Sequence, residues 1–245
     1  MSILSKIKLG ENKEDFLLKL NTFLKNNNKG FCCAINANII VECFKKYPYL
    51  EIIKKAVFNT CDGINVKRIY NLTQKSKINL YPGPDLFNDL VFKDHRYKHY
   101  FLGGKESILN GLKENILSKN IDVDEKSFYS PPFLSADSFD YVAIAALINK
   151  QNPDIIWIGL GAPKQEIFMH HLLPHINKGL MIGVGAAFNF YSGLDEYKRA
   201  PYLMKKYHLE WLFRAFQEPK RIIKRQLKNL LYLPLIIFNE FKIKK

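Results

Sequence analysis

Residues 155 to 166 constrain the fold of this chain more than any other stretch of the sequence. The run Ile155-Ile156-Trp157-Ile158 is short, apolar and rich in β-branched residues, a pattern that predicts a strand buried on both faces of a sheet. Gly159 and Gly161 follow and allow the backbone to turn sharply. Pro163 then suits the first turn of a helix, where its missing N–H would have had no partner. The stretch therefore predicts a strand, a glycine turn and a helix in immediate succession.

The turn after this strand is a candidate anion site. Open α/β sheets hold phosphates at such turns, because the unpaired N–H groups and the dipole of the following helix both attract negative charge. Lys164 and Gln165 are expected to face the same crevice. The spacing Gly-x-Gly-x-x-Lys matches neither the dinucleotide fingerprint nor the Walker A loop, so a plain tight turn between strand and helix remains the alternative.

The pattern of an apolar strand followed by a glycine turn occurs twice more along the chain. Residues 179 to 188 run from an apolar strand into Gly183 and Gly185, and residues 97 to 117 run from a strand through Gly103-Gly104 into a helix. Repetition of strand, glycine turn and helix predicts an α/β fold with a Rossmann-like, doubly wound sheet. Ligands are then expected at the edge of the sheet where the carboxyl ends of the strands meet.

The N-terminal part of the chain fits the same scheme. The spacing of apolar side chains predicts a helix over residues 15 to 25. A short apolar strand over residues 31 to 35 then delivers Asn36 and Asn38 to the ligand-binding edge. Further elements are expected as helices through residues 43 to 46, 50 to 56 and 138 to 149, and as a short strand over residues 127 to 130.

Several carboxylates are candidates for a functional role. Asp62 follows a short apolar segment and precedes a glycine, which is typical of a turn, and it is a candidate base only if it faces the glycine turns. Asp85 is expected to cap a helix or lie in its first turn. Asp122-Val123-Asp124 matches the Asp-x-Asp pattern that many nucleotide-sugar enzymes use to hold a metal ion. It lies in a polar stretch between a helix and a short strand, so no metal site is expected there.

Charge is distributed unevenly along the chain. The formal net charge is +14, and residues 198 to 245 carry 13 Lys or Arg against three Glu, a net of +10. Such a patch attracts polyanions, which means nucleic acid or an anionic membrane surface. With 245 residues, 47% of them apolar, the chain can bury a full core, and we expect a catalytic core over residues 1 to 195 and an appendage over residues 196 to 245.

The appendage is expected to be helical and amphipathic. An aromatic-rich helical stretch over residues 202 to 216 is interrupted at Glu218-Pro219, and Pro219 begins a second helix. On a helical wheel the basic residues of this helix group together, and its apolar residues fall on roughly the opposite side. This pattern predicts a helix that lies on a membrane surface, with an ordinary surface helix packed on the core as the alternative. The basic group is Lys220, Arg221, Lys224, Arg225 and Lys228, and the apolar group is Ile222, Ile223, Leu227, Leu230 and Leu231.

Neither the cysteines nor the hydropathy indicates a secreted or membrane-spanning protein. The four cysteines show no metal-ligand spacing, and the N-terminus lacks an apolar signal segment, so free thiols in a cytosolic protein are expected. The apolar run over residues 230 to 238 is too short to span a bilayer.

With these residues in view, the chain resembles the WecG/TagA/CpsF family of bacterial glycosyltransferases. The resemblance covers most of the chain, and its most specific parts are residues 159 to 166, 183 to 188, Arg199-Ala200-Pro201, 209 to 214 and 217 to 221. It implies a Rossmann-like core that takes a UDP-sugar and passes the sugar, with inversion, to a saccharide on a membrane-held polyprenyl diphosphate, without a metal ion. N-acetylmannosamine and its acid are among the sugars that such families transfer.

The resemblance also implies roles for individual residues. Asp62 of Asp62-Gly63 corresponds to the family's proposed base. The implied nucleotide-sugar-binding residues are Gly103, Gly104, Gly159, Gly161, Ala162, Pro163, Lys164, Gln165, Gly183 and Gly185. The implied acceptor-binding residues are Asn36, Asn38, Arg214, Arg221, Lys224 and Arg225. The expected location is the inner face of the cell membrane, where the protein attaches peripherally as a monomer or a homo-oligomer.

Three positions depart from the family pattern. Asn36 stands where members carry threonine, Leu80 where they carry arginine, and Pro131-Pro132-Phe133 where many carry His-Gly-Tyr. Two other functional classes stay open. A nucleic-acid-binding α/β protein would explain the basic tail, although an apolar face opposite the basic one suits a membrane better. A Rossmann oxidoreductase would explain the glycines, but Gly-x-Gly-x-x-Gly and a ribose-binding acid are missing.

Overall fold

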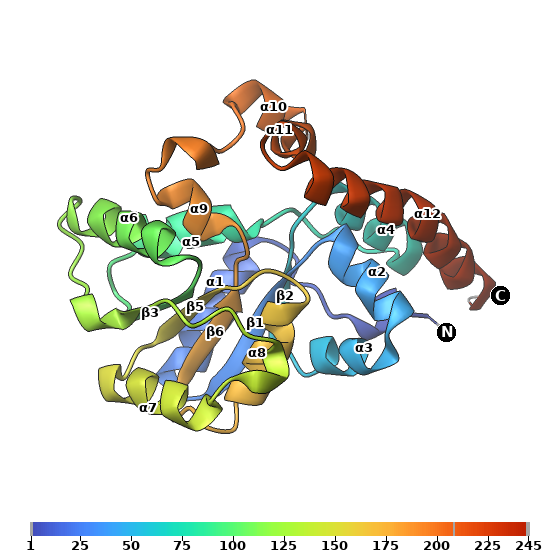
Figure 1. The fold of residues 1–245 in the computed structure, drawn as a ribbon. Helices are drawn as coiled ribbons and strands as arrows, with labels where there is room; N and C mark the ends of the chain where they lie inside the picture. Colours follow the sequence, from blue (N-terminus) through green and yellow to red (C-terminus); the bar gives the residue numbers. More distant parts are fainter. Residues whose placement is uncertain (1, 208, 244–245) are drawn as a thin grey trace.

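A six-stranded parallel sheet lies at the centre of the computed structural model, which describes residues 2–207 and 209–243 (Figure 1). The strands follow the order β2-β1-β6-β5-β3-β4, and every neighbouring pair is parallel. The predicted α/β fold with a doubly wound sheet is therefore confirmed. The strands are β1 (Lys29–Ile35), β2 (Phe58–Cys61), β3 (His99–Gly103), β4 (Phe128–Tyr129), β5 (Ile155–Gly159) and β6 (Gly179–Gly183).

Helices cover both faces of the sheet (Figure 1). In the described chain they are α1 (Lys13–Lys25), α2 (Ala37–Lys45), α3 (Tyr47–Lys54), α4 (Ile64–Gln74), α5 (Gly83–Phe92), α6 (Glu106–Leu117), α7 (Tyr141–Gln151), α8 (Lys164–Leu172), α9 (Ala187–Tyr191), α10 (Tyr202–Lys206), α11 (Glu210–Gln217) and α12 (Pro219–Ile243). Short 3-10 turns occur at Leu4–Lys6, Glu125–Ser127, Ala136–Ser138 and Asp195–Tyr197.

Strand β5 shows how the two faces are filled. Its side chains alternate, and all four of its large apolar residues are fully buried. Ile156 and Ile158 pack into the core shared with α2, α3, α7 and α8, whereas Ile155 and Trp157 pack into the core shared with α1, α5 and α6. The prediction of a strand buried on both faces is confirmed, since each face of β5 meets its own layer of helices.

The strand ends are level at the carboxyl edge of the sheet. Gly103 of β3 pairs with Gly159 of β5, and Ile158 of β5 pairs with Gly183 of β6. All strands run in the same direction, so the three glycine turns predicted from the sequence lie on neighbouring strands at one edge. The strand register therefore locates the candidate site at the carboxyl edge of the sheet.

Side-chain caps explain where two helices differ from their predicted bounds. Helix α2 begins at Ala37 instead of near residue 43, because the side chain of Asn36 accepts a hydrogen bond from the N–H of Ile39 at 3.2 Å. Helix α7 begins at Tyr141 instead of Ser138, because Asp140 accepts from the N–H of Ala143 at 2.9 Å.

Helix α12 packs across the outer surfaces of α2 and α4 (Figure 1). It contributes Leu233 and Ile236 to the same apolar core as β1 and β5, and Ile222 is fully buried. Near its end, the buried carboxylate of Glu240 accepts hydrogen bonds from the N–H groups of Ile3 and Leu4. The appendage predicted over residues 196 to 245 thus shares a core with the rest of the chain and holds its N-terminal segment.

The predicted apolar face of this helix is divided in the structure. Ile222 is buried, whereas Ile223, Leu227, Leu230 and Leu231 are between 52% and 74% exposed, so the predicted apolar group is buried at one position and exposed at the other four. Contacts with α2 and α4 decide which side of α12 is buried, and a helical wheel does not include these contacts. An exposed apolar stripe remains on α12, formed by Ile223, Leu227, Leu230, Leu231, Leu235 and Phe238. No helix in the described part of the chain has the length and apolar composition needed to cross a bilayer.

Candidate active site

Asp62 and Asn36 lie together at the carboxyl ends of adjacent strands. Asp62 directly follows β2, and its N–H donates to the carbonyl of Ile35 at the end of β1, at 2.8 Å. The side-chain Nδ2 of Asn36 donates to Oδ2 of Asp62 at 3.4 Å, while its Oδ1 caps α2. One amide therefore orients the carboxylate and begins a helix, and the region between Asp62 and the charged side chains of α11 and α12 that act on it is here called the crevice.

The surroundings of Asp62 oppose its ionisation overall. Burial raises the pKa of the Asp62 carboxyl, the hydrogen bond from Asn36 lowers it, and the nearby carboxylate of Glu210 raises it further. Arg214 and Arg225 act in the other direction and lower the pKa. The net direction is upward, which suits a carboxylate that must take a proton during a reaction.

Arginines of α11 and α12 form a cationic cluster over this carboxylate. Burial lowers the pKa of Arg214, with a further contribution from the charge of Arg221. Burial, together with the charges of Arg214 and Arg221, lowers the pKa of Arg225 to about 10. The guanidinium of Arg221 also lies 3.9 Å from the position that a Cβ would take on Gly161. The cluster therefore extends from Asp62 to the glycine turn after β5. Glu218 compensates part of its charge through an ion pair with Arg221 at 2.5 Å, and the remaining excess of positive charge makes the cluster receptive to an anion.

Gln165 lies beneath the two central glycine turns. Its Oε1 accepts hydrogen bonds from the N–H of Gly161 at 3.2 Å and from the N–H of Gly185 at 3.1 Å. Its Nε2 donates to Glu166 at 2.7 Å, and the other oxygen of Glu166 accepts from the hydroxyl of Tyr49 at 2.9 Å. Predicted as a ligand-binding side chain, Gln165 is buried here and ties the turns after β5 and β6 to each other.

Close packing accounts for several of the predicted ligand-binding glycines. A Cβ on Gly103 would lie 2.8 Å from the backbone of Gly159, and a Cβ on Gly159 would lie 2.6 Å from the ring of Phe188. At Gly183 a Cβ would meet the amide of Gln165 at 3.0 Å. These three positions bring the strand ends together, and positive φ occurs at Gly103 as well as at Gly104, Gly161 and Gly185 in the turns.

Two further candidates lie away from the cationic cluster. The ammonium of Lys164 lies over the rings of Phe133 and Phe139, at 5.0 and 4.9 Å from their centroids, and burial lowers its pKa. Lys224 is exposed on α12.

Asp124 of the Asp-x-Asp pattern caps the short turn at Glu125–Ser127 by accepting a hydrogen bond from the N–H of Lys126 at 2.8 Å.

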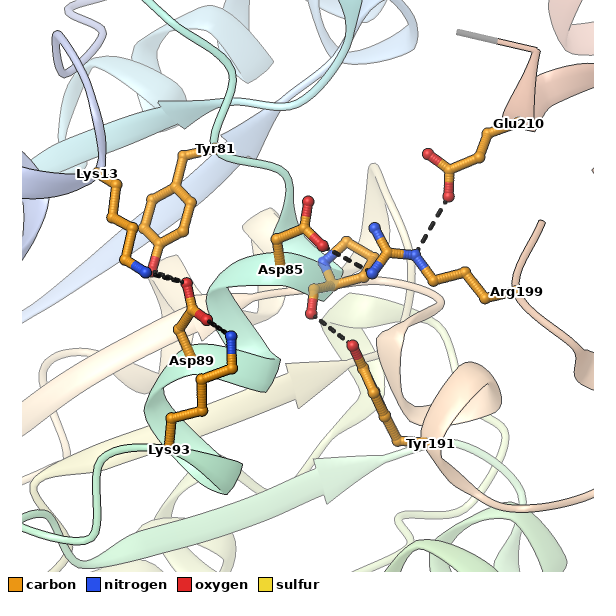
Figure 2. A network of polar contacts seen from close by, with 9 residues as sticks. Lys13, Tyr81, Asp85, Asp89, Lys93, Tyr191, Arg199 and Glu210 are labelled. Carbon is orange, nitrogen blue, oxygen red and sulfur yellow. Dashed lines mark hydrogen bonds and ion pairs between the residues drawn. The ribbon is translucent and has the colours of Figure 1, made fainter. Parts of the chain in front are cut away.

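Arg199 connects the appendage to the core (Figure 2). Its guanidinium forms an ion pair with Asp85 of α5 at 2.6 Å and a second with Glu210 of α11 at 3.3 Å. The hydroxyl of Tyr191 donates to the carbonyl of Pro84 at 3.0 Å beside this pair. Asp85 lies in the first turn of α5, as predicted, and it anchors the segment that presents Glu210 and Arg214 to the crevice.

Sequence reasoning assigned no role to Glu210, Arg199 or Glu166. Glu210 and Arg214 are four residues apart on α11, so helical periodicity alone would have placed both on one face. No comparable local pattern indicates that Arg199 joins Asp85 to Glu210, because α5 and α11 are far apart in the sequence.

The sequence is similar to a known protein family along nearly its whole length. The glycosyl transferase WecG/TagA/CpsF family matches residues 3–245. An N-acetylglucosaminyldiphosphoundecaprenol N-acetyl-beta-D-mannosaminyltransferase of Bacillus subtilis is 31% identical over 222 residues, which cover 86% of this chain and 80% of that protein. A protein of the same name from Bacillus spizizenii is 29% identical over 210 residues, or 82% of this chain and 76% of its own length.

The raised pKa of Asp62 leads to a prediction about stability. Below the ordinary aspartate pKa of about 3.9 the carboxyl is neutral in both states, and the Asp62→Asn variant should unfold at nearly the same temperature as the wild type. As pH rises, the unfolded state ionises first, so the native state loses stability until pH exceeds the raised pKa of Asp62. At neutral pH we therefore expect Asp62→Asn to raise the melting temperature above that of the wild type. Calorimetry between pH 3 and pH 8 measures this difference, and a variant less stable than the wild type at pH 7 would contradict it.

Proposed function

Because this chain belongs to the WecG/TagA/CpsF family of glycosyl transferases, we propose that it transfers a hexose from a UDP-sugar to a saccharide carried on polyprenyl diphosphate. A sugar of the N-acetylmannosamine class is the proposed donor group, since both relatives are named for transfer of that sugar to an undecaprenol-linked acceptor. The product would serve in the synthesis of a bacterial cell-surface polysaccharide.

One observation carries this proposal. The carboxylate of Asp62, whose pKa is raised, lies beside an arginine cluster at the sheet edge that also carries the glycine turns of three strands. A reaction between two diphosphate-bearing substrates needs both features. It needs a base for the attacking hydroxyl, and it needs cations for the diphosphate groups.

The proposed reaction is a single displacement with inversion. The acceptor hydroxyl attacks the anomeric carbon of the donor sugar while the bond from that carbon to the UDP oxygen breaks. The hydroxyl proton passes to the carboxylate of Asp62, and the electron pair of the broken bond leaves on UDP. Asn36 keeps the carboxylate oriented, since its Nδ2 lies 3.4 Å from Oδ2 of Asp62. The raised pKa makes the carboxylate of Asp62 a stronger proton acceptor than an ordinary aspartate.

The arginines have two proposed roles. Arg221, beside Gly161, is placed to stabilise negative charge that develops on the departing UDP. Arg214 and Arg225 are proposed to hold the acceptor diphosphate, because guanidinium groups bind such oxygens through paired hydrogen bonds. Binding of an anion would also offset the burial and the repulsion among the arginines, which together lower the pKa of both side chains.

Transfer from a UDP-sugar tests this assignment directly. Purified protein should convert UDP-N-acetylmannosamine and a polyprenyl-diphosphate-linked N-acetylglucosamine into UDP and an extended lipid product, detected by mass spectrometry. Asp62→Asn should lower the turnover rate by about 10²-fold or more, the usual scale for loss of a general base. UDP should protect this variant against thermal unfolding as well as it protects the wild type. Transfer at a near-normal rate by Asp62→Asn would remove Asp62 from the role of base.

We further propose that the reaction needs no divalent metal ion. Support comes from Asp124, which is engaged in capping a short turn, and from the arginines, which can supply the positive charge that a metal would otherwise provide. EDTA should therefore leave the transfer rate unchanged, and the double variant Asp122→Ala, Asp124→Ala should keep most of its activity. A rate that depends strictly on added manganese or magnesium would refute this proposal.

The exposed apolar stripe of α12 is proposed to dock the protein peripherally on the inner face of the cell membrane. Lys220, Arg221 and Lys224 are exposed along the same helix, and each basic residue near an anionic leaflet contributes about 1 kcal/mol. The apolar side chains would enter the boundary between headgroups and acyl chains.

Vesicle flotation tests this docking. Wild-type protein should float with vesicles that contain phosphatidylglycerol, and high salt should weaken the binding. The double variant Leu235→Asp, Phe238→Asp should lose most of the bound fraction. Leu18→Asp is the matched control, since Leu18 is similarly exposed but lies on α1. Equal loss in the variant and the control would argue against α12 as the docking element.

A further inference from the structure

An apolar groove lies between α4 and the two appendage helices α11 and α12. Its volume is about 550 Å³, within the range of small-ligand sites. Most of its lining is apolar, with Ile69 from α4, Trp211 from α11, and Ile222, Leu227 and Leu230 from α12. The lining extends along α12 from Ile222 to Ile237, which is about 22 Å at the rise of an α-helix. The length of the groove and its mostly apolar lining suit a linear apolar chain.

The groove and the cationic crevice use neighbouring faces of α11. Trp211 and Ala215, one turn apart, line the groove. Glu210 and Arg214, the residues immediately before them, are turned toward the crevice, where Glu210 pairs with Arg199 and Arg214 acts on Asp62. Helix α11 therefore lies between the cationic crevice and the apolar groove, and one helix separates the two.

Helix α12 repeats this arrangement. Ile222 and Gln226 line the groove, while the preceding residues Arg221 and Arg225 belong to the arginine cluster. On the core side, α4 supplies Asn65 and Arg68 to the groove and begins two residues after Asp62. Groove and crevice thus meet along three elements, and a molecule with a diphosphate at one end and an apolar chain at the other would occupy both.

We propose that this groove between α4, α11 and α12 binds the first isoprene units of a polyprenyl diphosphate whose diphosphate lies on the arginine cluster. The proposal rests on the proposed function for the identity of the acceptor. Continuity with the exposed stripe of α12 supports it, because Leu227 and Leu230 belong both to that stripe and to the groove. The lipid chain would then pass from the bilayer along α12 to the crevice without crossing water.

Binding of farnesyl diphosphate in the absence of donor and membrane tests the groove. Trp211 lines the groove and reports occupancy by its fluorescence, since the second tryptophan, Trp157, is fully buried in the core. Wild-type protein should bind farnesyl diphosphate about tenfold or more tightly than inorganic diphosphate. Equal affinities for the two ligands would overturn the proposal.

Two matched double variants separate the groove from the rest of the stripe. Ile223→Ser with Leu227→Ser removes apolar side chains that line the groove, and it should abolish most of the tenfold preference for farnesyl diphosphate. Leu231→Ser with Leu235→Ser removes equally exposed side chains that lie outside the groove lining, and it should keep the preference. A comparable loss of preference in both double variants would overturn the proposal in favour of unspecific apolar contact.

The failure of this inference is distinguishable from failure of the proposed reaction. Tight binding of farnesyl diphosphate without any sugar transfer would leave the groove assignment standing and refute the reaction. Sugar transfer without a preference for farnesyl diphosphate over inorganic diphosphate would support the reaction and refute the groove assignment. Analytical sedimentation tests whether a second copy of the chain fills the groove instead. A wild-type dimer that dissociates in the Ile223→Ser, Leu227→Ser variant would show that it does, and would overturn the proposal.

Discussion

The carboxamide of Gln165 is the contact on which the candidate site depends. It accepts hydrogen bonds from the N–H groups of Gly161 and Gly185, so the turns after β5 and β6 are held in one arrangement. Its orientation is determined by Glu166, which needs a donor and therefore takes Nε2. Tyr49 completes the network from α3. Because a buried polar group that loses its partner costs about 1–3 kcal/mol, the contacts stabilise one another and resist local rearrangement of the sheet edge.

Above this edge, the protein holds like charges together at a cost to its own stability. Arg214 and Arg225 are half-buried and repel each other electrostatically. Asp62 and Glu218 partly compensate their charge, while burial opposes the ionisation of Asp62. Arrangements of this kind destabilise the free protein and favour a bound anion, which is the usual exchange between stability and function at active sites.

The appendage holds this charge cluster in place because it is packed as part of the core. Helix α12 buries Ile222 and Leu233, and Glu240 near its end holds the N-terminal segment. Arg199 fixes the preceding segment through Asp85 and Glu210. The same helix exposes an apolar stripe to solvent. The packing of α12 therefore joins this exposed apolar stripe to the candidate site.

Local sequence patterns determined the elements, and tertiary contacts decided how the site uses them. The apolar run of residues 155 to 158, the glycines that follow it and two repeats of the same pattern were enough to predict a doubly wound sheet with a ligand edge, because strand propensity and turn geometry depend on near neighbours. The inward turn of Gln165 was not predictable, since its support comes from Tyr49, 117 residues before Glu166. The burial of Ile222 alone among the apolar residues of its predicted face likewise depends on where α12 meets the core. A helical wheel records the angles of side chains around one axis, and only the packing of distant helices decides which of those angles points inward.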